Sequence, residues 1–393
     1  MPSASRSRSL PSGDPPSVSD PIRIDVAAAA GGYPVLVGAG ASSSLPQLAR
    51  AHAPGGRVGL VSDSNVGPLH AERIAEACRQ EGLAVSLQTF PAGERSKTRT
   101  RWAELTDAFL DFGLGRDGCV MAVGGGVATD LGGFVAATYL RGVPVIQVPT
   151  SYLAMIDASV GGKTGVDVEA GKNLVGAFHA PVAVVADTAL LRTLPAKERG
   201  EGLVEAVKHG AILDGDHLEV IEEGASDLLA AEADTAASVI AASVRIKAEV
   251  VAEDEREGGY RQILNFGHTV GHAVEAASEY GLGHGSAVAL GMVAEAQMGE
   301  EMGITVAGTR DRLERVLGRI LGRDAVSDAA PETADALFTR AVGFLDQDKK
   351  VRGGRPRYVL LEGIGSVAPG EGWTHDVPDE IAHGALERVL KGG

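Results

Sequence analysis

The sequence predicts an α/β protein with a mostly parallel sheet in its N-terminal half and a helical C-terminal half. Short apolar runs alternate with polar stretches of helical period from Ile22 to about Val185, which is typical of parallel strands joined by helices. After Asp187 long alanine-rich segments of helical period take over. A chain of 393 residues is also longer than one hydrophobic core usually grows, so we expect two domains that share a cleft.

The change of pattern sets the expected domain boundaries. We expect a disordered tail over residues 1–20, a nucleotide-binding α/β domain over 21–187 and a mainly α-helical metal and substrate domain over 188–393. The first residues are rich in Ser, Pro and Arg and contain no apolar segment, which excludes a secretory signal. The prolines also disfavour the amphipathic helix of an organelle transit peptide.

The individual elements follow from the same periodicity. Strands are expected at Arg57–Val61, Val85–Phe90, Cys119–Val123, Val143–Val148 and Val182–Ala186, with helices Pro68–Glu81 and Thr100–Phe112 between them. In the second half we expect helices Ala231–Val251, Thr269–Ala277 and Ser286–Met302, followed by one late strand at Arg357–Leu361.

Composition excludes several classes of protein. A formal net charge of −16 argues against nucleic acid as the main partner, although a local cluster of Lys and Arg can still hold a small anion, because salt screens distant charges. No apolar run approaches the ~18 residues of a membrane helix. Cys78 and Cys119 stand far apart, so no disulfide framework is expected and a cytoplasmic location fits.

A glycine cluster follows one of the expected strands. Cys119–Val123 runs directly into Gly124, Gly125 and Gly126, and Val127–Leu140 can then form a helix. Glycines at such a turn let backbone N–H groups approach a pyrophosphate at the positive end of the helix. A merely tight turn explains them equally well, and the spacing is not that of the common dinucleotide fingerprint.

Polar residues follow two further strands. Asp63 and Asn65 lie where ligands of open α/β sheets bind, although an Asx turn that caps the next helix explains them almost as well. Glu94 and Lys97 follow another strand and could hold the ribose and phosphates of a cofactor, or could be ordinary surface charges.

Three histidines suggest a metal site. His268 and His272 are four residues apart, so they share one face of a helix, and His284 follows within seventeen positions. Imidazoles with one carboxylate are the usual ligands of catalytic zinc. Spacing alone leaves the carboxylate open between Glu275, which is nearest in sequence, and Glu205, which stands in an otherwise apolar helix and therefore needs a partner.

Several cationic residues border glycine-rich or apolar segments instead of polar ones. Such side chains suit phosphate or carboxylate groups, although any one of them could be solvated or structural. They are Arg141, Lys163, Lys172, Lys208, Lys247 and Arg261.

The ordered motifs together resemble one family of enzymes. They are GGGVATDLGGFVAATYLRG, VPTSYLAMIDASVGGKTGVD, AGKNLVGAFHAP, LVEAVKHG, KAEVVAEDEREGGYRQILNFGHTVGHA and HGSAVALGMV. In this order they resemble the 3-dehydroquinate synthases, within the sugar phosphate cyclases, over about Ile22 to Leu361. The resemblance implies an active site between the two domains, a homodimer, and NAD and a divalent metal ion, Zn²⁺ or Co²⁺, as cofactors.

The resemblance also implies roles for single residues. The implied metal ligands are Glu205, His268 and His284, which leaves His272 as a polar or acid–base group and Glu275 as structural. The implied NAD contacts are Asp63, Asn65, Glu94, Lys97, Gly125, Gly126, Val127, Asp130, Thr150 and Ser151, with Asp157 and Lys172 near the nicotinamide ribose. The implied substrate contacts are Asp157, Lys163, Asn173, Lys208, Lys247, Arg261, Asn265 and His272, with Arg141 reaching across from the partner subunit and Lys349 or Lys350 completing the set.

The implied reaction converts 3-deoxy-D-arabino-heptulosonate 7-phosphate to 3-dehydroquinate with loss of phosphate, in the shikimate pathway to aromatic amino acids. NAD is used catalytically and is not consumed. Two alternatives stay open: a cyclase of the amino-dehydroquinate or valiolone type, which SVGGKTG and GKNLVGAF disfavour, and a metal-dependent polyol dehydrogenase, which the phosphate-suited cations disfavour. A non-catalytic nucleotide-binding protein would not need three candidate metal ligands.

The sequence departs from the family at two positions near the site. Ser286 stands where many relatives carry glutamate, and we expect weaker metal binding if that glutamate orients a ligand. Ser151 stands where threonine is more usual, and both residues can donate a hydroxyl. Neither departure removes an implied ligand.

Overall fold

The computed structural model describes residues 20–28, 31–255, 258–279, 281–322, 334–351 and 356–391, without the side chains of 347–351. All but the last residue of the expected tail over 1–20 therefore lie outside the described residues. Among the described residues, every helix is too short or too polar to cross a lipid bilayer.

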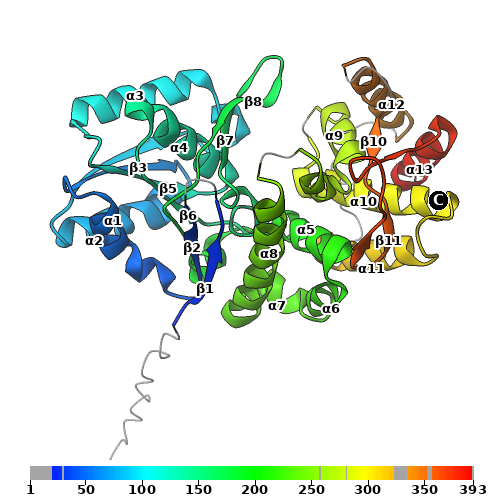
Figure 1. Ribbon diagram of the computed structural model, residues 1–393, viewed down its shortest axis with the longest axis horizontal. Helices are drawn as coiled ribbons and strands as arrows, with labels where there is room; N and C mark the ends of the chain where they lie inside the picture. The colour runs from blue at the N-terminus through cyan, green and yellow to red at the C-terminus, as the bar shows by residue number, and fades with distance from the viewer. Residues whose placement is uncertain are drawn as a thin grey trace, which may run out of the picture.

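A seven-stranded sheet forms the centre of the N-terminal half (Figure 1). Its strands lie side by side in the order β1-β2-β9-β6-β5-β3-β4, and all neighbours are parallel except β1 and β2. The strands are β1 (Ile22–Val26), β2 (Tyr33–Val37), β3 (Arg57–Asp63), β4 (Ala84–Phe90), β5 (Cys119–Gly124), β6 (Val145–Pro149) and β9 (Ala183–Ala186). The expected mostly parallel α/β sheet is confirmed.

Helices cover both faces of this sheet. On one face α1 (Leu45–His52) and α2 (Glu72–Gln80) bury Ala75 and Cys78 against Leu60 and Met121. On the other, α3 (Arg99–Phe112) and α4 (Gly126–Thr138) pack against neighbouring strand residues such as Val61. Leu60 and Val61 of β3 thus point into different cores, which is why the middle of this strand is apolar at successive positions instead of alternating.

The order in which the strands are added to the sheet reverses at β3. β4 lies on one side of β3, and the next strand along the chain, β5, lies on the other side. In open α/β sheets, the loops that leave the carboxyl ends of two such strands diverge and leave a crevice in which ligands bind. Asp63 ends β3 and Gly124 ends β5, so the sequence motifs at these two strand ends meet at that point.

A long antiparallel hairpin stands apart from the main sheet. It consists of β7 (Lys163–Val168) and β8 (Gly171–Phe178), and it extends from the sheet towards the helical half (Figure 1). The side chains of Leu174 and Phe178 on it are exposed.

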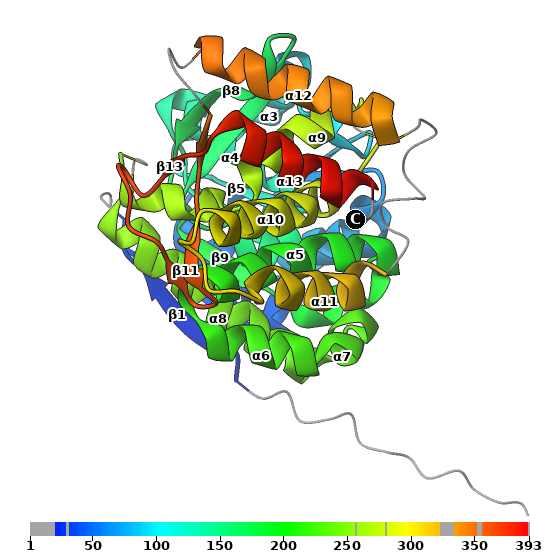
Figure 2. The ribbon, with the colours of Figure 1, turned by 90° about the vertical axis from the view of Figure 1, so that its right-hand side faces the viewer.

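The C-terminal half is a bundle of helices, which Figure 2 shows stacked across one another. They are α5 (Ala196–Leu213), α6 (Gly215–Glu223), α7 (Ala225–Ala230), α8 (Ala233–Glu253), α9 (His268–Ala277), α10 (His284–Glu301), α11 (Thr309–Leu321), α12 (Ala334–Val351) and α13 (Asp379–Lys391). Four short strands, β10 (Arg357–Tyr358), β11 (Leu361–Gly363), β12 (Ser366–Val367) and β13 (His375–Asp376), form two small separate sheets.

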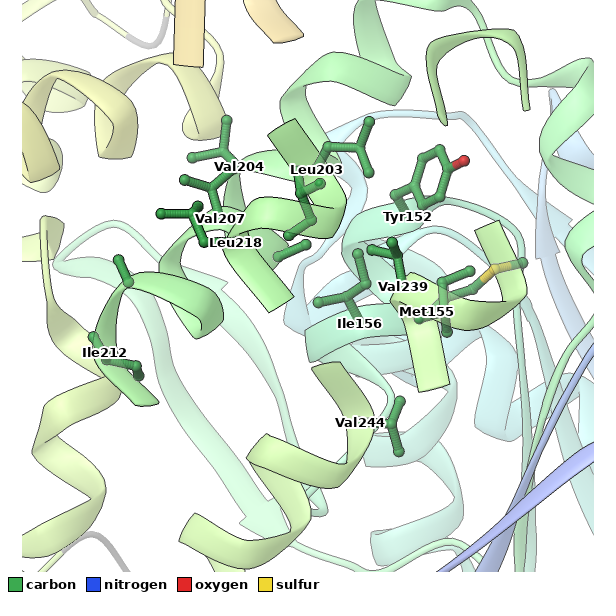
Figure 3. Packing of buried hydrophobic residues seen from close by; sticks show 14 of the residues in the cluster. Tyr152, Met155, Ile156, Leu203, Val204, Val207, Ile212, Leu218, Val239 and Val244 are labelled. Atoms are coloured by element: carbon green, nitrogen blue, oxygen red, sulfur yellow. The ribbon is translucent and has the colours of Figure 1, made fainter. Parts of the chain in front are cut away.

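One hydrophobic core joins the sheet to the helices. The segment after β6 carries three buried side chains, Tyr152, Met155 and Ile156. They pack against Leu203 of α5 and Val239 of α8 (Figure 3). The buried Tyr152 hydroxyl also donates a hydrogen bond to the carbonyl oxygen of Leu228, at 2.9 Å. The largest core of the protein is therefore shared between the two halves.

The structure differs from the expected elements in three places. The edge pair β1 and β2 and the hairpin β7–β8 were not expected as strands. The single late strand expected at Arg357–Leu361 is wrong, because β10 and β11 there belong to two different sheets. The division into domains at residue 187 remains a prediction.

Candidate metal and nucleotide site

The carboxyl ends of β3, β5 and β6 form one edge of the site. Asp63 accepts hydrogen bonds from the N–H groups of Asn65 and Val66, at 2.8 and 3.0 Å, so it does form an Asx turn. The same side chain faces the glycine loop, because a Cβ on Gly124 would lie 3.4 Å from Asp63 Oδ2. The loop thus brings exposed backbone and a carboxylate together at the start of α4, where N–H groups favour an anion.

The loop has no room for a side chain at Gly124, whereas a Cβ at Gly125 would make only an ordinary contact. A Cβ on Gly124 would lie 2.5 Å from the Cβ of Ala128, and one on Gly125 would lie 3.6 Å from Ser151 Oγ. Thr150 N donates a 2.9 Å hydrogen bond to the carbonyl oxygen of Gly124, which holds the two strand ends together.

Three carboxylates surround the side chain of Lys97 next to this edge of the sheet. Its buried ammonium is 2.9 Å from Glu94, 3.2 Å from Asp130 and 3.8 Å from Asp167. Burial raises the pKa of Asp130 to about 6, although Lys97 opposes that shift. The four side chains form a local network, in which Asp167 is a member that sequence reasoning missed.

The implied metal ligands come together in the helical half. One ligand atom of each of Glu205, His268 and His284 lies within 4.8 Å of the other two. Nε2 of each histidine is 3.6 Å from Glu205 Oε1. Each 3.6 Å distance is short enough for one ion with bonds of ~2 Å to bridge Glu205 and that histidine.

Helix geometry places these side chains. His268 and His284 are the first residues of α9 and α10, and Glu205 lies in the middle of α5. The start of α9 approaches the middle of α10 closely because the meeting positions are glycines: a Cβ on Gly291 would overlap the carbonyl oxygen of Gly267. Gly267 itself has a φ of +79°, a left-handed conformation that L side chains rarely adopt.

The electrostatics suit a cation. Burial would raise the pKa of Glu205, but Lys208 and the two histidines hold it well below its usual range, so the carboxylate is ionised. Burial lowers the pKa of His268 to about 3, which leaves a neutral imidazole. Burial also acts to lower the pKa of His284, but Glu205 and Glu275 outweigh it and raise the value to about 10.

The donor set fits a divalent metal ion such as Zn²⁺ or Co²⁺. Glu205 forms an ion pair with Lys208, yet within the described residues neither carboxylate oxygen of this 1% exposed residue receives a hydrogen bond. Buried oxygens of this kind are costly unless something else satisfies them. Two imidazoles and one carboxylate are also a common ligand set of catalytic zinc.

A second possible ligand group shares His284. It consists of His272, Glu275 and His284. Glu275, however, already has partners: Lys172 Nζ donates to its Oε1 at 2.7 Å, and its Oε2 lies 3.4 Å from His284 Nδ1. Because His284 turns Nε2 to Glu205 and Nδ1 to Glu275, Glu275 has the position of a carboxylate that orients a ligating imidazole. Spacing had left Glu275 open as a metal ligand, and the resemblance had implied a structural role for it.

Buried cations adjoin the metal group. Lys208, Lys247 and Arg261 are at most 5% exposed. Lys247 Nζ lies 2.6 Å from Asp157 Oδ1 and donates to the backbone oxygen of the same residue at 2.5 Å. Burial lowers the pKa of Lys247 although Asp157 acts to raise it, and Arg261 and Lys208 lower it further. Lys208 and Lys247 face the two carboxylates of Glu205 and Asp157, and the charge of Arg261 acts on Lys247, so the cluster favours an anionic ligand.

The other predicted site residues are more exposed, although the N–H groups of Asn65 and Asn173 donate to Asp63 and Asp167. Asn65, Arg141, Lys163, Asn173 and His272 are exposed, and Asn265 is half-buried. His272 still borders the metal group, with its ring centre 5.3 Å from that of His268. Lys349 and Lys350 belong to α12, but their side chains lie outside the described residues.

Three residues near the ligands were missed, the half-buried Glu201 and the buried Glu295 and His209. Glu201 contacts the first turn of α10, and Glu295 accepts a 2.8 Å hydrogen bond from Gly267 N beside His268. His209 follows Lys208, and within the described residues neither of its ring nitrogens has a hydrogen-bond partner. Glu295 stands in the apolar run VALGMVAEAQM, so the reasoning that singled out Glu205 would have found it as well.

Comparison with known proteins gives matches over most of the chain. The family models described as 3-dehydroquinate synthase N-terminal and 3-dehydroquinate synthase C-terminal match residues 87–201 and 202–351. The 3-dehydroquinate synthase of Symbiobacterium thermophilum is 47% identical over 361 residues, which cover 91% of this chain and 98% of that protein.

Solved structures of related cyclases have the same fold. A 2-deoxy-scyllo-inosose synthase complexed with carbaglucose-6-phosphate, NAD⁺ and Co²⁺ matches with a TM-score of 0.81 at 27% identity, covering 95% of this chain and 100% of that one. The 2-epi-5-epi-valiolone synthase ValA of Streptomyces hygroscopicus, with NAD⁺ and Zn²⁺ bound, matches with a TM-score of 0.78 at 28% identity, covering 92% of this chain and 97% of that one.

Proposed function

The chain belongs to the 3-dehydroquinate synthase family, and from that premise we propose that it converts 3-deoxy-D-arabino-heptulosonate 7-phosphate to 3-dehydroquinate and phosphate. It is an enzyme of the sugar phosphate cyclase type that uses NAD and a divalent metal ion. The observation that carries the proposal is that Glu205 belongs to two groups at once, the imidazole–carboxylate trio and the buried cation cluster.

Glu205, His268 and His284 would hold the metal ion. When bound, the ion supplies a Lewis acid for a substrate oxygen, and NAD supplies a reversible hydride acceptor. The ionised Glu205 contributes the negative charge that the ion needs, and the neutral imidazole of His268 offers its lone pair without first losing a proton.

Lys208, Lys247 and Arg261 would bind and orient the anionic groups of the substrate. Their burial excludes water, which strengthens each contact with a carboxylate or phosphate. Asp157 holds the ammonium of Lys247 in place through two contacts. His272, on the exposed side of the trio, is placed to exchange a proton with a substrate hydroxyl.

The dinucleotide would lie along the carboxyl ends of β3, β5 and β6. Backbone N–H groups at the start of α4 face this edge and suit a pyrophosphate. Asp63, beside the glycine loop, suits a ribose hydroxyl. Lys172 extends from the hairpin to Glu275 next to the metal ligands, so it is placed between the two cofactors.

The function is tested by incubating the purified protein with NAD, Zn²⁺ or Co²⁺ and the heptulosonate phosphate. We expect stoichiometric release of phosphate and formation of 3-dehydroquinate without net NADH. Glu205→Ala is the control, because it removes a proposed ligand and should release no phosphate. Accumulation of NADH from a simple polyol, with no release of phosphate from the heptulosonate, would contradict the proposal.

A cyclase of the inosose or valiolone type is the second candidate. The chain is 27–28% identical to solved members of these types and 47% identical to a 3-dehydroquinate synthase. The same assay with glucose 6-phosphate or sedoheptulose 7-phosphate in place of the heptulosonate separates them.

We also propose that the enzyme is a cytoplasmic homodimer. Cys78 and Cys119 are buried free thiols, which suits a reducing compartment. Arg141 is exposed at the end of α4 and could complete the site of a second subunit. Sedimentation should give twice the chain mass, and mixing inactive Arg141→Ala with inactive Glu205→Ala should restore part of the activity.

A further inference from the structure

Glu201 connects the two helices that carry the proposed ligands Glu205 and His284. It lies four residues before Glu205 on α5, so both carboxylates share one face of that helix. The carboxylate of Glu201 accepts two hydrogen bonds from Ser286 in the first turn of α10, from the backbone N at 2.9 Å and from Oγ at 2.5 Å.

The backbone on both sides of His284 lies in close contact with Glu201. A Cβ on Gly283 would overlap the carboxylate of Glu201, and a Cβ on Gly285 would overlap its backbone carbonyl. Both neighbours of His284 are thus glycines in direct contact with Glu201. A carboxylate at the start of α10 is also favoured by the helix dipole.

Ser286 depends on the carboxylate of Glu201, which accepts the hydrogen bond of its hydroxyl group. Ser286 is only 6% exposed, so its hydroxyl needs the acceptor that Glu201 provides.

We propose that Glu201 is a positioning residue that fixes His284 relative to Glu205 and so sets the affinity and geometry of the metal site. The inference rests on the proposed function, because it requires that Glu205 and His284 bind the ion. Glu201 itself lacks any contact with the ion in this role. It acts through the first turn of α10.

The test is a competition titration of metal-free protein with a chromogenic chelator and Co²⁺, together with the visible spectrum of bound Co²⁺. We expect Glu201→Gln to weaken Co²⁺ binding ~10-fold, as loss of an outer partner of a ligand typically does, and to shift the Co²⁺ bands. Glu198→Gln is the matched control, since Glu198 is an exposed glutamate on the same helix, and it should bind Co²⁺ like the wild type.

Two milder variants cover the case in which Glu201→Gln folds poorly. Glu201→Asp keeps the charge but shortens the reach, and Ser286→Ala removes only the Oγ hydrogen bond; both should weaken Co²⁺ binding less than Glu201→Gln. Combining Ser286→Ala with Glu201→Gln should cost less than the two single losses added together, because the two residues share a contact.

The outcomes separate this inference from the proposed function. Wild-type protein that binds no Co²⁺, or Glu205→Ala that binds it as well as wild type, overturns the metal site and the positioning role with it. Normal binding by the wild type, loss in Glu205→Ala and wild-type affinity and spectrum in the Glu201 variants overturn the positioning role alone.

Discussion

Lys172 Nζ lies 2.7 Å from Glu275 Oε1, an ion pair that joins the β7–β8 hairpin to α9 across 103 positions of sequence. The other oxygen of Glu275 faces His284 Nδ1 at 3.4 Å. The carboxylate of Glu275 therefore bridges Lys172, on the proposed dinucleotide side, and His284, a proposed metal ligand.

These contacts predict that Glu275 orients the imidazole of His284 without binding the metal ion itself. Replacing Glu275 with Gln should weaken Zn²⁺ binding ~10-fold, because the imidazole of His284 loses the carboxylate that orients it. Lys172→Met removes the other partner and should weaken NAD more than Zn²⁺. Zn²⁺ and NAD affinities measured separately on both variants check this, and a Glu275→Gln protein with wild-type Zn²⁺ affinity would contradict it.

Removing a proposed ligand should abolish turnover. Glu205→Ala and His268→Ala should each lose the metal ion, because each takes away one of three ligands. His272→Ala is the informative control, since it should keep the ion but lose most activity if Glu205, His268 and His284 are the ligands. Metal content per chain and turnover are measured together, and full activity with bound metal in either ligand variant would refute the assignment.

Lys163 is predicted to serve the substrate and not the nucleotide. It opens β7 with an exposed side chain, and Lys163→Ala should leave NAD affinity largely unchanged while activity is lost. Lys197→Ala, an exposed lysine on α5, should change neither quantity. Equal turnover in the Lys163 and Lys197 variants would show that Lys163 is not needed.

The shared core should make the stability of the two halves interdependent. Leu203 is 0% exposed between α5 and the segment after β6, and Leu203→Ala should cost ~3 kcal/mol of unfolding free energy. Leu110→Ala, at a 56% exposed position of α3, should cost less than ~0.5 kcal/mol. Urea unfolding followed by circular dichroism measures both, and similar losses in the two variants would speak against a shared core.

Glu295 should make stability depend on pH. Burial raises its pKa to about 8 from a reference of 4.5, against the pull of three backbone N–H groups. The folded protein thus binds this proton more tightly than the unfolded chain, so the contribution to stability is complete below the reference value and is lost as pH rises towards about 8.

Glu295→Gln removes this titration. Relative to the variant, wild-type protein should lose stability between about pH 5 and about pH 8, with a slope of at most ~1.4 kcal/mol per pH unit. Metal-free protein is used for both, so that ion binding does not contribute. Parallel pH profiles of the two proteins would mean that Glu295 is ionised at neutral pH.

The sequence predicted the sheet best where strands are buried on both faces. The strands expected from Arg57 to Ala186 overlap the buried β3, β5, β6 and β9, where apolar runs between helices leave few alternatives, and also the half-buried edge strand β4. The hairpin of residues 163–178 escaped because it contains glycines and exposes Leu174 and Phe178, so neither an apolar run nor a clean alternation marks it.

Local spacing predicted part of the site in the same way. His268, His272 and His284 stand close in sequence, and the helix period alone brings two of them together. Beyond the neighbouring Glu94, the partners of Lys97 could not be predicted from spacing, because Asp130 lies 33 residues away and reaches Lys97 only through the packing of α4 against the sheet. Glu201 stayed hidden for a similar reason, since its partner is 85 residues away on another helix.

The glycines between α9 and α10 have a consequence for how this protein can change over evolutionary time. Because Gly267 and Gly291 meet backbone to backbone, the separation of two histidines is built into main-chain atoms and not into replaceable side chains. A side chain at Gly291 would force the backbones of α9 and α10 apart, so a substitution there would move the two imidazoles as well as disturb the packing.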